Sequence, residues 1–191
     1  MEEETNHYYT KAKLAYEKKN FDYAKKLLEY VLAKKPDSQQ IHRLLYLTLE
    51  EGTEMEAFGK ENFFTKTKAF LLKIKGDILS IQKRFLGAAL SYEKAFICQP
   101  KNLFFLNIAG QQFLKANFVD IATTIFEEIL KTNPTYIPVL KTLAPLYLER
   151  GESEKSLQIY ERLHELLPYD LEIKNRIQRL HADQAIKKSF L

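Results

Sequence analysis

Glycine, proline and cysteine are scarce in this chain of 191 residues, and tryptophan is absent. Six glycines and six prolines are too few for a β-sandwich, which needs a turn every ~8–12 residues. Long apolar runs are also missing, and none approaches the ~20 residues of a membrane-spanning helix. These shortages favour an all-α protein with no membrane span.

Cys98 is the single cysteine, so no disulfide can form within the chain. Proteins of this size made for oxidising compartments often carry disulfides, so the count favours a reducing compartment. The first residues, MEEETNHYYTKAK, lack the basic patch and apolar stretch of a secretory leader. We therefore expect a cytoplasmic location.

The net charge is small, at +4 from 29 basic and 25 acidic residues. The densest basic stretch, residues 60–84, carries seven lysines and arginines against two acidic residues. On a lysine-rich helical protein such a stretch is usually a solvated face. The charge pattern therefore disfavours nucleic acid or an acidic membrane surface as a partner.

The residue groups that catalysis or metal binding needs are not found together in the sequence. The six glycines are scattered, so no glycine-rich phosphate loop is present. The four histidines show no H-x-x-x-H spacing, and a lone cysteine cannot supply a cysteine metal site. We expect no catalytic residues, no cofactor and no metal, and therefore a protein that is not an enzyme.

An internal repeat is the strongest signal in the sequence. Pro100, Pro134 and Pro168 are equally spaced, and a fixed period of about 34 residues is typical of helical repeat arrays. Five further columns keep the same spacing: Leu72, Leu106 and Leu140; Gly76, Gly110 and Ala144; Leu79, Phe113 and Tyr147; Ala88, Ala122 and Ser156; and Tyr92, Phe126 and Tyr160. The columns predict regular units at 69–102, 103–136 and 137–170.

Two more units and a tail complete the array over residues 1–191. A unit at about 5–38 repeats the pattern and ends at Pro36, which leaves 39–68 as a divergent, shortened unit. Residues 171–191 carry the narrow apolar stripe Ile173, Ile177 and Leu180 and are expected to cap the array, because exposed repeat ends need polar covers.

Each regular unit has the pattern of two antiparallel helices. Leu106, Ala109, Gly110 and Phe113 fall at i, i+3, i+4 and i+7, which defines one helix face. We expect Gly76 and Gly110 to mark close helix crossings, where a missing side chain leaves room for a neighbouring aromatic ring. About ten or eleven helices and essentially no strand are predicted in all.

These columns resemble the tetratricopeptide repeat (TPR) family over most of the chain, and the resemblance implies a right-handed α-solenoid of antiparallel helix pairs. It also implies a protein-interaction adaptor or scaffold whose concave groove, lined by the first helix of each unit, takes a peptide, helix or protein loop. Family members that hold the acidic tails of heat-shock chaperones use a clamp of Lys, Asn, Lys and Arg. Of the corresponding residues only Lys73 matches, and Asp77 would repel such a tail.

The expected groove combines an apolar strip with polar neighbours that would orient a mildly acidic or polar ligand. Phe70, Ile74, Phe104 and Ile108 recur at matching offsets in two successive units and are predicted to form the strip. The complete set of predicted partner-binding residues is Phe70, Lys73, Ile74, Asp77, Phe104, Asn107, Ile108, Gln111, Lys141 and Thr142.

Two alternatives remain open from the sequence. The array could assemble with copies of itself into a structural homo-oligomer. Less strongly supported is a regulatory module that uses the basic stretch 60–84 to associate with nucleic acid. The identity of any protein partner is not encoded in the repeat columns.

Overall fold

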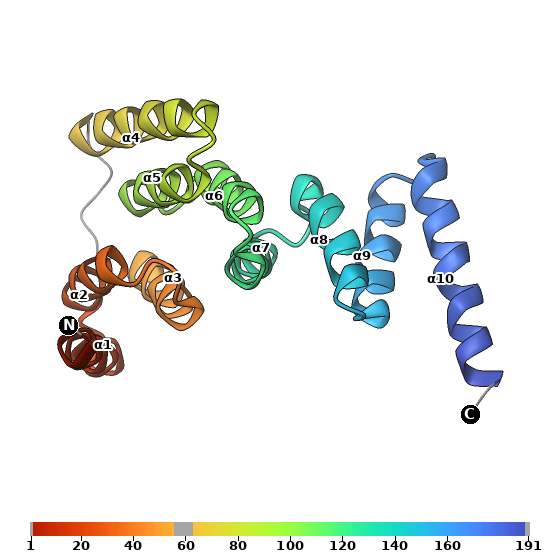
Figure 1. The fold of residues 1–191 in the computed structure, drawn as a ribbon, viewed down its shortest axis with the longest axis horizontal. Coiled ribbons are helices and arrows are strands. Elements are labelled where there is room, and N and C mark those ends of the chain that lie inside the picture. The colour runs from red at the N-terminus through yellow and green to blue at the C-terminus, as the bar shows by residue number, and fades with distance from the viewer. Residues whose placement is uncertain (1, 56–62, 190–191) are drawn as a thin grey trace. The chain divides into compact units, whose positions relative to one another are not determined.

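A computed structural model of the chain describes residues 2–55 and 63–189, and within these ranges it contains ten α-helices and no strand (Figure 1). The number of helices agrees with the prediction. The helices are α1 (Glu2–Glu17), α2 (Phe21–Lys34), α3 (Gln39–Glu54), α4 (Phe63–Ile81), α5 (Phe85–Cys98), α6 (Leu103–Lys115), α7 (Val119–Thr132), α8 (Ile137–Glu149), α9 (Ser153–Leu166) and α10 (Leu171–Ser189).

The chain divides into two compact units, residues 1–128 and 129–191, and the boundary lies within α7. The first unit contains α1 to α6 and most of α7. The second contains the end of α7 and helices α8, α9 and α10. The sequence predicted one array over residues 1–191, which the structure divides at these bounds.

Four helix hairpins turn in the same way, and three of their turns keep the repeat period. Lys83, Asn117 and Gly151 occupy the same position of successive repeats and have positive φ angles of 59°, 65° and 76°, and Lys19 has 56°. At each turn the next residue's N–H bonds back to the first helix, as in Arg84 N to Leu79 O at 2.9 Å. This is the hydrogen-bond pattern of a Schellman motif, which ends a helix with one residue in the left-handed conformation.

The divergent unit departs from the boundaries that the sequence predicted. Its first helix is present as α3, but residues 63–68 belong to α4, which has 19 residues where α6 and α8 have 13. Helix α4 therefore begins six residues before the predicted start of the third unit at 69, because its apolar helix pattern continues upstream of the repeat columns. The predicted short second helix falls largely on 56–62, outside the described residues.

Close helix crossings in the first unit depend on two glycines, as predicted. A Cβ atom at Gly110 would lie 2.6 Å from Cε1 of Phe126, and one at Gly76 would lie 2.9 Å from the ring of Tyr92. Phe126 is fully buried and Tyr92 is almost so. Because neither ring has room to retreat, the two glycines set the distance between the helices of each hairpin.

The second unit has its own apolar core, which includes the capping helix. Leu140 and Ala144 of α8, Leu163 of α9, and Ile173 and Leu180 of α10 belong to one buried cluster, with Ile177 packed against it. The predicted stripe on residues 171–191 is therefore confirmed as a packing face. The hydroxyl of Ser156 donates to the carbonyl of Ala144 at 2.7 Å and ties α9 to α8.

Replacing Gly110 with leucine should lower the free energy of unfolding by about 1–3 kcal/mol, because the side chain overpacks the contact with Phe126. Gly87→Ala is the matched control, since a Cβ there meets Leu79 only at an ordinary 3.4 Å. Denaturant unfolding of both variants checks the expectation. A Gly110→Leu protein as stable as the parent would contradict it.

Candidate functional site

The predicted groove residues of α4 separate into an exposed apolar pair and an ion pair. Phe70 and Ile74 are 59% and 39% exposed. Lys73 Nζ donates to Asp77 Oδ2 at 2.7 Å, one helical turn away. The Lys73 ammonium therefore already has a carboxylate partner within the chain.

Asp77 is held on its other side by α5. The hydroxyl of Tyr92 donates to Asp77 Oδ1, and the tyrosine ring reaches this position by lying over Gly76. The hydrogen bonds from Lys73 and Tyr92 lower the pKa of Asp77, while burial and the bond to Asp77 raise the pKa of Tyr92. Lys73, Asp77 and Tyr92 thus form a polar bridge between α4 and α5.

The predicted groove residues of α6 differ in exposure. Phe104 is 47% exposed, whereas Ile108 is half-buried and packs against Ala88, Tyr92 and Ala109. Ile108 is therefore part of the packing between α5 and α6 as much as of an open strip. Asn107 and Gln111 are half-buried, and Asn107 Oδ1 is buried without a hydrogen-bond partner among the described residues.

The two remaining predicted residues lie on α8, in the second unit. Lys141 Nζ lies 3.4 Å from Asp170 Oδ2, and the Thr142 hydroxyl donates to the carbonyl of Pro138 at 3.0 Å. Both side chains thus make contacts within their own unit.

A buried polar network that sequence reasoning missed joins α3 to α5. His42 is fully buried; its Nδ1 lies 2.6 Å from Glu93 Oε1, and its Nε2 lies 2.9 Å from the carbonyl oxygen of Pro36. The hydroxyl of Tyr46 donates to the same Glu93 oxygen. His42 also packs on α6, with its ring centroid 5.3 Å from that of Phe113.

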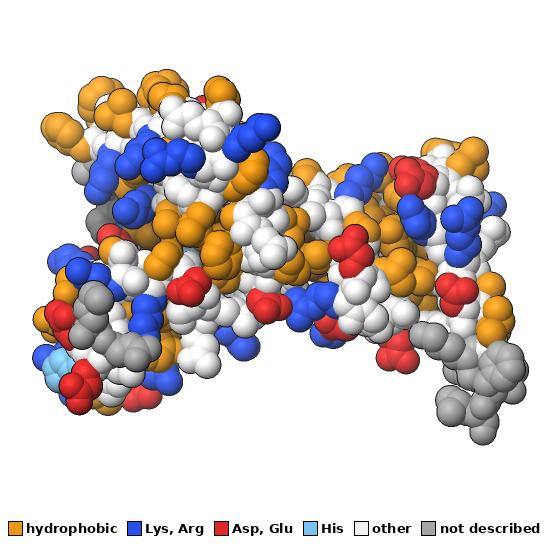
Figure 2. All heavy atoms as spheres, in the orientation of Figure 1, with side chains coloured by type: hydrophobic (Ala, Val, Ile, Leu, Met, Phe, Trp, Pro, Cys, Tyr) orange, Lys and Arg blue, Asp and Glu red, His pale blue; other side chains and the backbone are white. Residues whose placement is uncertain are grey.

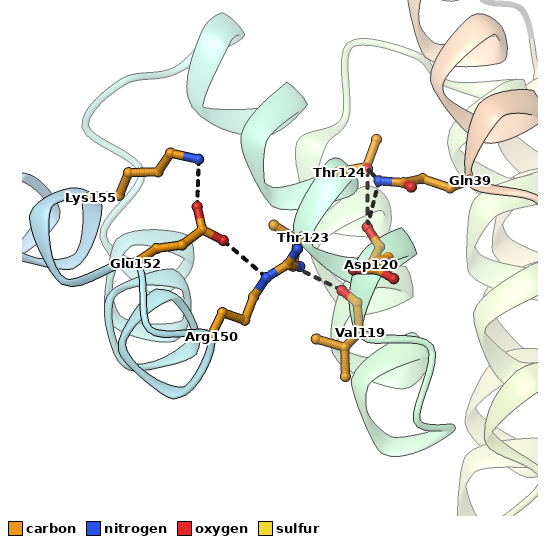
Figure 3. Close-up of polar contacts among 8 residues, drawn as sticks. All are labelled: Gln39, Val119, Asp120, Thr123, Thr124, Arg150, Glu152 and Lys155. Carbon is orange, nitrogen blue, oxygen red and sulfur yellow. Dashed lines mark hydrogen bonds and ion pairs between the residues drawn. The ribbon is translucent and has the colours of Figure 1, made fainter.

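Helix α3 also contacts α7 within the first unit. Figure 3 shows Gln39, whose Nε2 donates to Thr124 Oγ1 at 2.8 Å and approaches the Asp120 carbonyl at 3.5 Å. Contacts from α3 thus reach α5, α6 and α7. The helix of the divergent unit is built into the first unit, and the exposed apolar residues of α4 remain uncovered by it.

Within residues 2–55 and 63–189, no group of three His, Cys, Asp or Glu side chains is placed to hold a metal ion. Cys98 is partly exposed, and burial raises the pKa of its thiol. In the same ranges, no helix is both long enough and apolar enough to cross a bilayer.

Comparison with solved structures identifies the fold as that of tetratricopeptide repeats. The first TPR of Spaghetti (RPAP3), solved with an HSP90 peptide SRMEEVD, has a TM-score of 0.54 at 21% identity and covers 63% of this chain and 95% of its own. The Sgt2 TPR domain from Aspergillus fumigatus has a TM-score of 0.51 at 16% identity, covering 63% of this chain and 80% of its own.

A third TPR structure extends the likeness over almost the whole chain. The TPR domain of P58(IPK) has a TM-score of 0.51 at 18% identity and covers 97% of this chain and 56% of its own. No family model and no curated protein matches the sequence. The chain therefore has the TPR fold, which the repeat columns predicted.

The buried His42 should make stability fall as pH rises above its ordinary pKa of 6.5. Burial opposes its protonation, but the charge and hydrogen bond of Glu93, the Pro36 carbonyl and the charge of Asp37 together raise its pKa. The stabilisation is therefore complete below pH 6.5 and is lost as pH rises through the raised value.

Thermal melts of the parent, His42→Gln and His7→Gln from mildly acidic to mildly alkaline pH measure this slope. We expect a flatter profile for His42→Gln and an unchanged profile for the exposed His7 variant. Equal slopes in all three proteins would show that His42 does not carry the pH dependence.

Proposed function

We propose that this chain is a non-enzymatic interaction adaptor whose first unit binds a protein partner on the exposed face of α4 and α6. The observation that carries the proposal is the exposure of Phe70, Ile74 and Phe104 on the first helices of two successive hairpins. These side chains do not belong to the buried cores of the hairpins, and exposed apolar residues at repeat spacing suit docking of a peptide or helix.

Among the predicted groove residues of the first unit, the one cation, Lys73, is already paired, which favours an apolar or amphipathic segment over one held by a clamp on its carboxylates. Lys73 is paired with Asp77, so its ammonium is not an isolated charge for a partner carboxylate. Asn107 Oδ1 would gain a hydrogen bond if a partner's donor drew the side chain outward. An acidic peptide such as the one bound by the Spaghetti domain is therefore not the partner that we propose.

Two further properties remain predictions: a cytoplasmic location and the absence of enzymatic activity. Assembly into homo-oligomers is the alternative function, and light scattering at several protein concentrations distinguishes it from an adaptor that acts as a monomer. Salt-dependent binding to nucleic acid would support the third possibility.

Peptides selected from a displayed random library on the purified chain test the proposed surface. The combined variant Phe70→Ser and Phe104→Ser should weaken the best peptide by at least about tenfold, because it removes two exposed apolar anchors. Tyr169→Ser with Leu171→Ser is the control, since these side chains are 94% and 73% exposed on the second unit. Undiminished peptide binding by the Phe70 and Phe104 variant, with an unchanged melt, would contradict the proposal.

A further inference from the structure

Helix α4 exposes far more apolar surface than the repeat requires. Seven of its side chains are between 39% and 83% exposed: Phe63, Phe64, Phe70, Leu71, Ile74, Ile78 and Ile81. On the opposite side of the helix, Ala69 and Gly76 are buried against the rest of the unit. An apolar side chain normally occupies the packed face of a helix, so α4 is amphipathic in the opposite sense from an ordinary surface helix.

The exposed residues form one continuous row. At about 100° per residue, Phe63, Phe70, Ile74, Ile78 and Ile81 fall within about 80° of one another around the helix axis, with Phe64 and Leu71 at one margin. At about 1.5 Å per residue the row is about 27 Å long. The part of α4 that precedes the repeat column, residues 63–68, lengthens this row by two phenylalanines.

Positive charge borders the row on both sides. Lys68 and Lys75 lie at one margin and Lys66 at the other, and all three are exposed. The only acidic residue of α4 is Asp77, which is already bonded to Lys73 and Tyr92. In Figure 2 hydrophobic side chains line the outer edge of α4, and lysine or arginine side chains lie beside them.

The exposed apolar row with lysines on both sides favours one kind of binding partner over others. A second copy of the chain would place two lysine-bordered rows against each other, and their like charges would repel. The row lies on the side of α4 opposite the buried Ala69 and Gly76 and is exposed along its whole length, and a bilayer surface can cover such a row from end to end. An apolar helix face with lysines at its margins is the pattern of helices that lie in the surface of anionic bilayers.

We propose that α4 lies flat on an anionic phospholipid bilayer, with its apolar row inserted at the boundary between headgroups and acyl chains. The side chains of Phe63, Phe64 and Ile81 enter the bilayer, while the ammonium groups of Lys66, Lys68 and Lys75 reach lipid phosphates. The charge pattern of the sequence alone disfavoured an acidic membrane surface as a partner. The exposed phenylalanines of α4 reverse that expectation, because a merely solvated basic helix face does not need them. It goes beyond the proposed adaptor function. Phe70 and Ile74 belong to both surfaces, so the bilayer proposal is tested at Phe63, Phe64 and Ile81, which the adaptor surface does not use.

Vesicle sedimentation with the full chain tests the charge requirement. The protein should pellet with phosphatidylcholine vesicles containing about 30% phosphatidylserine, and should stay in solution with phosphatidylcholine alone or at high salt. Lys66→Glu with Lys68→Glu and Lys75→Glu should abolish pelleting. Lys18→Glu with Lys101→Glu and Lys174→Glu is the control, because it makes the same change in formal charge, from +4 to −2, at exposed lysines elsewhere. If both triple variants lost vesicle binding equally, net charge alone would explain the binding, and the proposal would be overturned.

Insertion is tested separately, by a fluorescent reporter at the end of the row. The chain has no tryptophan, so Phe64→Trp introduces a single tryptophan that can be excited selectively at wavelengths where tyrosine does not absorb. Its emission should shift to shorter wavelength on addition of the anionic vesicles. Tyr169→Trp, at an exposed site of the second unit, should show no shift. An unshifted Phe64→Trp spectrum would overturn the inserted geometry.

Removal of the apolar side chains at the two ends of the row distinguishes bilayer binding from protein binding. Phe63→Ser with Phe64→Ser and Ile81→Ser should reduce vesicle binding at least about fivefold, while the library peptides that report on Phe70 and Phe104 still bind. Vesicle binding that is unchanged by these substitutions would overturn the bilayer proposal. If the parent protein does not bind vesicles and the library peptides need Phe63 and Phe64, the row binds protein and not a bilayer. The adaptor proposal can therefore fail while this one stands, and the reverse.

Discussion

Close contact between an aromatic ring and a helix backbone is the constraint on which the first unit depends. Tyr92 lies over Gly76 and Phe126 over Gly110, at distances that leave no room for a Cβ atom. Each contact brings two helices of a hairpin together and fixes their rotation. That rotation decides which side chains are buried, and it places Phe70, Ile74 and Phe104 on the side that faces away from the core.

The same contact determines the electrostatics of the α4 face. Because Tyr92 passes over Gly76, its hydroxyl reaches Asp77, and Asp77 in turn holds Lys73. Lys73 and Asp77, which lie beside the apolar residues of α4, are consequently paired within the chain. A surface of this kind is apolar in its centre and basic at its margins, through Lys66, Lys68 and Lys75, and both proposed interactions follow from that distribution.

Helix α3 shows how the array accommodates an irregular unit. It provides one described helix of the divergent unit, and His42 connects it to Glu93 in the buried network with Tyr46. A buried ion pair of this type is costly to desolvate and depends on complete hydrogen bonding. Here both ring nitrogens of His42 face acceptors, so the network specifies where α3 docks.

The sequence by itself determined the features that depend on local spacing. Proline, glycine and aromatic columns at one repeat period were sufficient for the helix pairs and for the close crossing at Gly110. The helical spacing of Ile173, Ile177 and Leu180 was sufficient for the capping stripe on α10. Only the tertiary structure decided that α4 begins at Phe63, that Ile108 packs inward, and that Lys73 and His42 have carboxylate partners. Those outcomes depend on residues distant in sequence, such as Tyr92 and Glu93, whose positions are set when the helices pack.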